Sequence, residues 1–196
     1  MHRGLKGVQL VISDAHEGLK RAIQEILAGA SWQRCRVHLM RNILAQAPKQ
    51  AQAMVGALVR TIFVQPDGTL AREQLETVVD NIGRRFPKAA EWLLEAADDV
   101  LAYMAFPPEH WRQIHSTNPL ERLNREIARR TDVVGILPNA EAALRLIGAV
   151  LQEQHEEWMA ARLYFSQGSM AKPYAARREN TGSESERTPP LPEIAA

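Results

Sequence analysis

The segment VQLVISDAHEGLK, residues 8–20, places a carboxylate directly after an apolar run. The run lacks the polar–apolar alternation of a half-exposed strand, which predicts a buried strand over 8–13. The pattern then changes to that of a helix over 15–28, and the segment WQRCRVH at 32–38 predicts a second strand. This strand–helix–strand order is typical of a parallel sheet, so it predicts the α/β fold class.

The rest of the chain carries helical patterns. No strand pattern occurs between about 39 and 116, and a helical block of this length inside an α/β sequence predicts an insertion. Two more helices are predicted, from Asn118 to about Arg130 and over about 139–165. The chain should be mostly helical overall, with a Ser-, Glu- and Pro-rich disordered tail. The expected organisation is a first α/β core part at 1–42, an all-helical insertion at 43–115, a second core part at 116–166 and the tail at 167–196.

Composition limits the classes of function. The 196 residues carry a formal net charge of +1, so a nucleic-acid role would depend on local basic patches. The single cysteine, Cys35, excludes an intrachain disulfide. No apolar run reaches the roughly 18 residues that a membrane span needs, and residues 1–10 lack the apolar region of a signal peptide. We therefore expect a cytoplasmic protein with no membrane partner.

Asp14 and Glu121 each have two explanations. Either could serve its own helix: Asp14 as an N-cap with Glu17 three residues later, and Glu121 behind an Asn118 cap or paired with Arg125 one turn on. Together they could instead bind metal, because a carboxylate at the end of a parallel strand lies where α/β sheets bind ligands. A site for two Mg²⁺ ions needs carboxylates that converge from different elements.

Arginines crowd the helix that carries Glu121. Arginine–phosphate contacts supply sequence-independent affinity for a polyanion such as DNA. The alternative is a solvated helix face, on which Arg122 would pair with Glu126 one turn away. The candidate DNA-contacting arginines are Arg122, Arg125, Arg129 and Arg130.

Cys35 and His38 form a C-x-x-H motif between the two acids. A closed structural zinc site needs four ligands, and the chain has no second cysteine, so we do not expect zinc. We expect Cys35 to be buried and His38 to be hydrogen-bonded near the acids. His16 could orient a ligand, touch phosphate or lie on the surface. A weaker alternative is an unrelated metallohydrolase that uses His16, His38 and Asp14.

Four segments taken together resemble the Mutator-type transposases of bacterial insertion sequences. They are VISDAHEGLK (11–20), QRCRVHLMRN (33–42), FPPEHWRQIHSTNPLERLNREIARRTDVVGILPN (106–139) and ALRLIGAVLQEQHEEW (143–158). The resemblance implies an RNase H-like fold, here partial, with an acidic DDE triad and an all-helical insertion. By resemblance Asp14 is the second Asp of the triad and Glu121 is its Glu, while Cys35 and His38 match the family's signature between them.

The resemblance also implies a reaction: Mg²⁺-dependent (or Mn²⁺-dependent) cleavage of DNA at the ends of the element, then attack of the freed 3′-hydroxyl on another phosphodiester. The partners would be the terminal inverted repeats and the target DNA, bound by a homo-oligomer at the nucleoid. Trp111 would stack on DNA or else belong to the core.

The triad's first Asp is expected upstream of residue 1. We therefore expect a truncated or frameshifted transposase that is inactive by itself. The alternatives are a non-catalytic DNA- or transposase-binding remnant that inhibits the full-length enzyme, or a decayed remnant that folds poorly.

Overall fold

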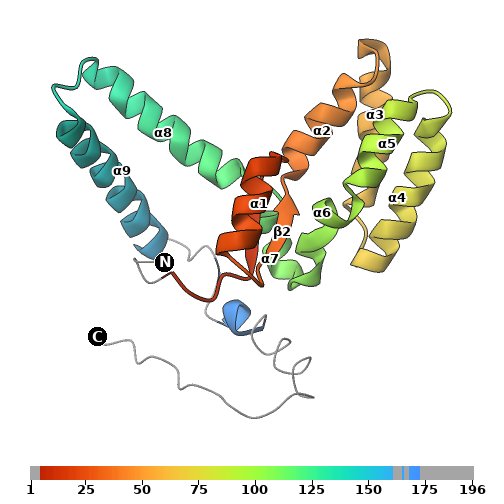
Figure 1. The fold of residues 1–196 in the computed structure, drawn as a ribbon, viewed down its shortest axis with the longest axis horizontal. Coiled ribbons are helices and arrows are strands. Elements are labelled where there is room, and N and C mark those ends of the chain that lie inside the picture. Colours follow the sequence, from red (N-terminus) through yellow and green to blue (C-terminus); the bar gives the residue numbers. More distant parts are fainter. Residues whose placement is uncertain (1–4, 161–164, 166–167, 173–196) are drawn as a thin grey trace, which may run out of the picture.

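The computed structural model describes residues 5–160, 165 and 168–172, and most of these residues are helical (Figure 1). The first elements are β1 (Leu10–Ser13), α1 (Glu17–Ile26) and β2 (Ser31–Arg34). The helices that follow are α2 (Arg36–Ala45), α3 (Lys49–Ile62), α4 (Gly68–Gly83), α5 (Pro87–Glu95), α6 (Ala97–Leu101), the 3-10 turn η1 (Ala102–Ala105), α7 (Pro108–Ile114), α8 (Asn118–Val134) and α9 (Ala140–Ala160). No helix of this described part is long and apolar enough to cross a membrane.

The strand–helix–strand prediction is confirmed. β1 and β2 are parallel neighbours, with Leu10 opposite Ser31 and Ser13 opposite Arg34. Their carboxyl ends therefore lie at the same edge of the sheet, where the chain continues into Asp14 after β1. Because the sheet has two strands within the described residues, its topology does not distinguish an RNase H-like fold from other α/β folds.

The second strand is shorter than the sequence pattern predicts. A strand over 32–38 was expected, but β2 ends at Arg34 and α2 begins at Arg36. The strand prediction is therefore wrong for the C-x-x-H motif, whose residues lie at the N-cap and in the first turn of a helix. The reason is tertiary packing: Leu39 and Ile43 lie one turn apart on α2 and are fully buried in the helical core.

Helices α2 to α6 build the main hydrophobic core of the described chain, which extends from Leu39 to Met104. The prediction of an uninterrupted helical region without strands is confirmed over these residues. Asp67 begins α4 by accepting a 2.9 Å hydrogen bond from the N–H of Leu70. This block is well packed, and a poorly folded remnant would not be expected to have such a core.

Gln33 joins the sheet to this helical block. Its side chain on β2 is fully buried, and its amide nitrogen donates to the carbonyl of Val100 at 2.9 Å. Its amide oxygen accepts from the N–H of Tyr103 at 2.8 Å. A buried amide with both ends satisfied fixes one orientation of its neighbours, so β2 is held against α6 and η1.

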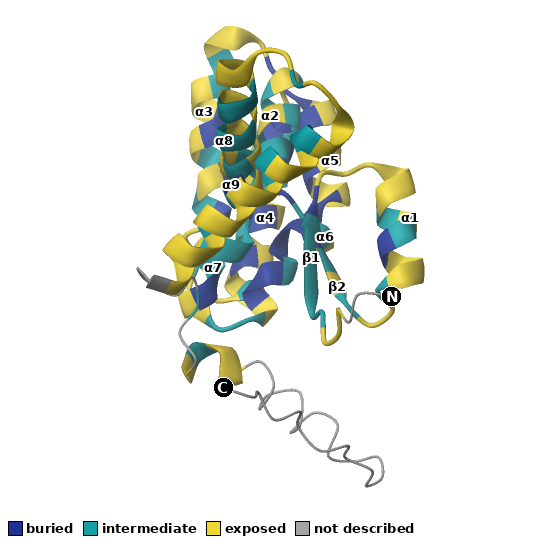
Figure 2. Ribbon diagram, turned by 90° about the vertical axis from the view of Figure 1, so that its left-hand side faces the viewer, coloured by how far each residue is buried: buried dark blue, intermediate teal, exposed yellow. Residues whose placement is uncertain are grey.

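Helices α8 and α9 form a hairpin that projects from the rest of the molecule (Figure 1). None of the residues of α8 is buried, and Figure 2 shows both helices mostly exposed. Gly135, with a φ of +72°, follows α8 in a conformation that favours glycine. The hairpin thus carries Glu121 at its base and the arginines along its length.

The predicted disordered tail is partly contradicted. Residues 168–172 are helical, and the Lys172 side chain pairs with Glu109 of α7. An ion pair to the body of the protein gives this segment a partner that composition alone does not reveal. Residues 166–167 and 173–196 lie outside the described part of the chain.

Candidate functional site

Asp14 directly follows β1 and is exposed. Its Oδ1 accepts a 2.8 Å hydrogen bond from the N–H of Ala15. The N-cap of α1 is His16, whose Nδ1 accepts from the N–H of Leu19 at 3.4 Å. The prediction that Asp14 caps the helix is therefore wrong, and the role belongs to His16. Among the described residues, Oδ2 of Asp14 has no hydrogen-bond partner, so this oxygen is open to a ligand.

Glu121 lies in the first turn of α8 and is held by neighbours from two elements. The Thr117 hydroxyl lies 3.0 Å from its Oε1, and the Nε2 atom of His38 lies 3.6 Å from the same oxygen. The side chain is 35% exposed, so this end of the helix is partly shielded from water. The predicted Asn118 cap is wrong, because Thr117 is the N-cap of α8. The predicted pairing with Arg125 is also wrong, because the described neighbours of the Glu121 carboxylate are Thr117 and His38.

Cys35 connects the sheet to the helix that carries Glu121. It is fully buried, and both the N–H and the hydroxyl of Thr117 lie within 3.4 Å of its sulfur. The N–H of Cys35 donates to the carbonyl of Ser13 at 2.8 Å. A continuous path of hydrogen bonds therefore runs from the end of β1 through Cys35 and Thr117 to Glu121, which brings the start of α8 to the carboxyl edge of the sheet.

The donor set at this edge suits a hard cation better than zinc. Asp14 and Glu121 offer carboxylate oxygens, which Mg²⁺ prefers, and Mg²⁺ takes few ligands from protein. In the described ranges no group of three or more His, Cys, Asp and Glu side chains could hold a metal ion. Asp14 and Glu121 are therefore two candidate oxygen ligands that no third such side chain joins within the described residues.

The Nε2 atom of His38 faces the Glu121 carboxylate, at 3.6 Å from its Oε1. Its other ring nitrogen, Nδ1, is buried and lacks a hydrogen-bond partner within the described structure. The C-x-x-H motif thus contacts Glu121 twice: through His38 directly, and through Cys35 by way of Thr117.

Arg129 and Arg130, both predicted to contact DNA, are engaged in ion pairs. Arg129 lies 2.7 Å from Oε1 of Glu126, and Arg130 lies 2.8 Å from the same oxygen and 3.1 Å from Glu153 on α9. The hydrogen bonds from Arg129 and Arg130 lower the pKa of Glu126 to about 2. Arg130 therefore ties α8 to α9 in the hairpin, whereas Arg129 pairs within α8.

Arg122 and Arg125, the other two candidates, are free of such pairs. Neither has an ion pair or a side-chain hydrogen bond to another described residue, so the predicted pairing of Arg122 with Glu126 is wrong. Both lie on the exposed surface of α8, within the first two turns after its start. They are the members of the set whose charge is available to an anion.

Trp111 belongs to the core. Its indole N–H donates to the carbonyl of Phe106 at 2.7 Å, and its ring meets that of Tyr103 edge-on with a centroid distance of 5.6 Å. The partly buried side chain packs against the main core. Of the two alternatives for Trp111, the structure therefore favours a core residue over a base-stacking residue.

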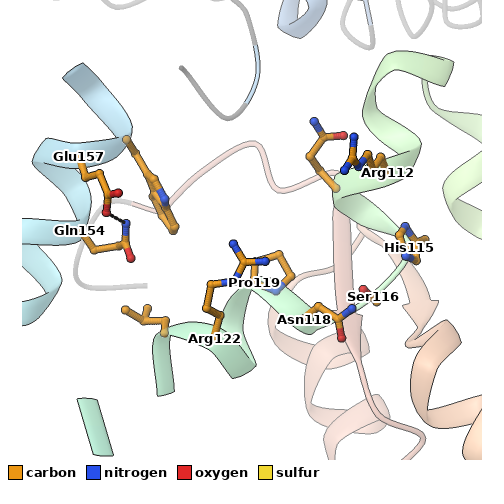
Figure 3. Close-up of a pocket in the computed structure, with 11 residues that line it drawn as sticks. Arg112, His115, Ser116, Asn118, Pro119, Arg122, Gln154 and Glu157 are labelled. Carbon is orange, nitrogen blue, oxygen red and sulfur yellow. Dashed lines mark hydrogen bonds between the residues drawn. The ribbon is translucent and has the colours of Figure 1, made fainter. Parts of the chain in front are cut away.

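A polar pocket beside the Glu121 helix was missed by the sequence reasoning. It has a volume of about 600 Å³ and lies between the end of α7, the start of α8 and the distal part of α9 (Figure 3). Arg122 lines it, together with Arg112 and Trp158. The residues were visible in the sequence, but their convergence depends on the turn between α8 and α9, for which no short-range signal exists.

His115 also lines this pocket. Burial lowers the pKa of His115 below its ordinary value, and the positive charge of Arg36 acts in the same direction. Its Nδ1 lies 2.8 Å from the carbonyl of Trp111, so in the neutral ring Nδ1 carries the proton and Nε2 is an acceptor.

Comparison with known proteins gives consistent results. The model of a family described as "Transposase, Mutator family" matches residues 1–161. The chain is 48% identical over 174 residues to the transposase for insertion sequence element IS1081 of Mycobacterium tuberculosis, which covers 89% of this chain and 42% of that protein. It is 42% identical to the transposase for IS406 of Burkholderia multivorans, over 84% of this chain and 42% of that protein. It is 43% identical to the transposase for IS256 in transposon Tn4001 of Staphylococcus aureus, over 80% of this chain and 40% of that protein. The chain thus spans about two fifths of the length of these relatives.

Proposed function

The chain belongs to the Mutator family of transposases, and on this premise we propose that Asp14 and Glu121 are two of the carboxylates of a DNA-cleaving and strand-transferring site that works with Mg²⁺ or Mn²⁺. The observation that supports the proposal most strongly is the path of hydrogen bonds from Ser13 through Cys35 and Thr117 to Glu121. The path links Glu121 to Ser13, the residue before Asp14, although the two acids are far apart in the sequence. The carboxyl edge of the sheet is where α/β proteins bind their ligands.

Each acid keeps an oxygen for a cation. Asp14 has one oxygen bonded to the backbone, and Glu121 has its Oε1 engaged by Thr117 and His38. Within the described structure the second oxygen of each carboxylate has no hydrogen-bond partner. When bound there, Mg²⁺ would supply Lewis-acid stabilisation of the charge that develops on the phosphate. Thr117 and His38 orient the Glu121 carboxylate by contacting its Oε1, so its Oε2 would be the oxygen available to a cation.

DNA is the proposed substrate: the terminal inverted repeats of the element and a target. Arg122 and Arg125 would contact phosphates near Glu121, because their charges are not engaged in ion pairs within the described chain. Arg130 would act indirectly by pairing with Glu153 and holding the hairpin together, and the charge of Arg129 is engaged by Glu126 on α8. We place this activity in an RNase H-like core with a helical insertion, acting as a homo-oligomer at the nucleoid, since two element ends must be held together.

This chain by itself would cut DNA poorly. A two-ion site needs carboxylates from several elements, and the described residues bring no third ligand to Asp14 and Glu121. The relatives are more than twice as long, so the complete activity is proposed for a protein of their length.

A second candidate function is DNA binding without cleavage, which would let the chain compete with a full-length transposase. The folded helical core favours it, as do Arg122 and Arg125, which form no ion pair with another described residue. It shares the DNA contacts of the first proposal but does not require a bound cation.

Cation binding separates the two candidates. Titration of the purified chain with Mn²⁺, followed by electron paramagnetic resonance, should show binding that falls about tenfold or more in Asp14→Asn and in Glu121→Gln. Glu141→Gln is the matched control, because Glu141 is an exposed carboxylate that pairs with Arg145 on α9. Equal Mn²⁺ binding by all four proteins would sink the catalytic proposal and leave DNA binding as the function.

A further inference from the structure

The pocket next to Glu121 has two chemically different halves. In Figure 3, Arg112, Ser116 and Asn118 lie on one side and Gln154 and Glu157 lie on the other, with Arg122 between them. The first side comes from α7 and the start of α8, and the second comes from α9. The halves therefore meet only when the hairpin is folded.

The first half suits a phosphate. Arg112 and Arg122 both line it, and neither forms an ion pair with another residue in the described part of the protein. The pocket also includes Asn118, at the N-terminus of α8, where the helix dipole favours an anion.

Ser116 adds a hydroxyl to this half. It lines the pocket, and its hydroxyl makes no hydrogen bond with any described residue, so it can donate to a phosphate oxygen. His115 lies next to it and presents the Nε2 acceptor of a neutral imidazole.

The second half suits a base. Trp158 lines the pocket with an aromatic side chain and is 41% exposed. Glu157 accepts a 2.7 Å hydrogen bond from Gln154 and keeps acceptor capacity for the N–H groups of a base edge. The Glu157 carboxylate repels a phosphate, so the phosphate is directed to the arginine side.

We propose that this pocket holds a single unstacked nucleotide of the DNA strand, with its phosphate between Arg112 and Arg122 and its base against Trp158. The inference rests on the proposed function, since it names the part of the DNA that is bound beside Glu121. The volume of about 600 Å³ is in the range of small-ligand sites and too confined for a duplex. Arg122 adjoins Glu121 in the sequence, so the held nucleotide lies close to the reacting phosphodiester.

A base must leave its stack to enter such a pocket. The cost is least where the base is already unpaired, as in a single-stranded extension at a duplex end. The pocket therefore selects DNA ends with an unpaired nucleotide over blunt duplex. Aromatic stacking of one base contributes enough to give a preference of about tenfold.

The test compares two fluorescein-labelled DNAs with the purified chain: a blunt duplex, and the same duplex with a short single-stranded extension that contains 2-aminopurine. Anisotropy should show about tenfold tighter binding of the extended DNA, and the 2-aminopurine fluorescence should fall on binding. Trp158→Leu should abolish both effects, whereas Trp158→Phe should retain most of the preference. Trp92→Leu is the control, because Trp92 is a similarly exposed tryptophan on α5 that does not line the pocket.

The outcomes separate the pocket from the proposed function. Equal binding of both DNAs by the wild-type chain overturns the nucleotide pocket and leaves the DNA-binding role intact. A preference that survives in Trp158→Leu also overturns the pocket. Absence of binding to either DNA contradicts the proposed function as well. Binding of free deoxynucleoside monophosphate by the chain, without a preference for extended DNA, would identify a site for free nucleotides. That result would overturn the assignment to the DNA strand.

Discussion

The Thr117 hydroxyl lies 3.0 Å from Oε1 of Glu121, one turn below it at the start of α8. The same hydroxyl lies 3.3 Å from the buried sulfur of Cys35. It has one proton, so it donates to one of these acceptors at a time. Because a carboxylate is the stronger acceptor, the arrangement favours donation to Glu121 and leaves the backbone N–H of Thr117 to the sulfur.

Removal of this hydroxyl tests its role in positioning Glu121. Thr117→Val keeps the branched shape but loses the donor, so the free energy of unfolding should fall by about 1 kcal/mol. Mn²⁺ binding should weaken about tenfold, because Glu121 is no longer oriented, while Thr117→Ser should restore it. Urea unfolding and Mn²⁺ titration measure the two effects. A variant that is less stable but binds Mn²⁺ as the wild type does would assign Thr117 a purely structural role.

Gln33 gives the clearest stability prediction. Gln33→Leu leaves the Val100 carbonyl and the Tyr103 N–H buried without their partner, and each unsatisfied group costs about 1–3 kcal/mol. We expect the free energy of unfolding to fall by about 2–4 kcal/mol in urea denaturation. Gln152→Leu, at an exposed glutamine on α9, should change it by less than about 0.5 kcal/mol. Equal effects of the two substitutions would show that β2 is not held by this amide.

His115 predicts a pH dependence of stability. Burial lowers its folded-state pKa below the unfolded value of about 6.5, so the unfolded state binds more protons between these two values. Stability should therefore fall as the pH drops below about 6.5. Arg36 and the ring of Tyr103 lie near His115, and neither is an anion that would stabilise the imidazolium. In His115→Gln the free energy of unfolding should change less between neutral and mildly acidic pH.

The same measurement on His155→Gln provides the control, because His155 is an exposed histidine on α9. That variant should keep the pH dependence of the wild type. If His115→Gln and the wild type lost stability in parallel on acidification, another group would be responsible.

The sequence predicts the local elements of this chain better than its site. The strand over 8–13 and the helical block were recognisable because apolar spacing repeats within a few residues. The helix at Arg36 was missed because burial of Leu39 and Ile43 by later helices decides it. Asp14 and Glu121 were identified singly, but the link through Cys35 and Thr117 joins residues 82 apart, for which no short-range pattern exists. The contact between Arg130 and Glu153 likewise depends on how the hairpin folds, whereas the pairs of Arg129 and Arg130 with Glu126 follow helical spacing.

The arginines of α8 should differ in their contribution to DNA binding. Arg125 has no ion pair within the described part of the chain, so Arg125→Gln should weaken binding of duplex DNA and reduce the slope of log K against log salt by about 0.9. Arg129→Gln should change the slope less, because the charge of Arg129 is already engaged by Glu126. Arg145→Gln serves as the matched control, since Arg145 pairs with Glu141 on α9. Anisotropy titrations over a range of salt concentrations give the slopes. If Arg125→Gln and Arg129→Gln reduced the slope equally, the ion pairs of the hairpin would have to open when DNA binds, and the whole of α8 would then be the contact surface.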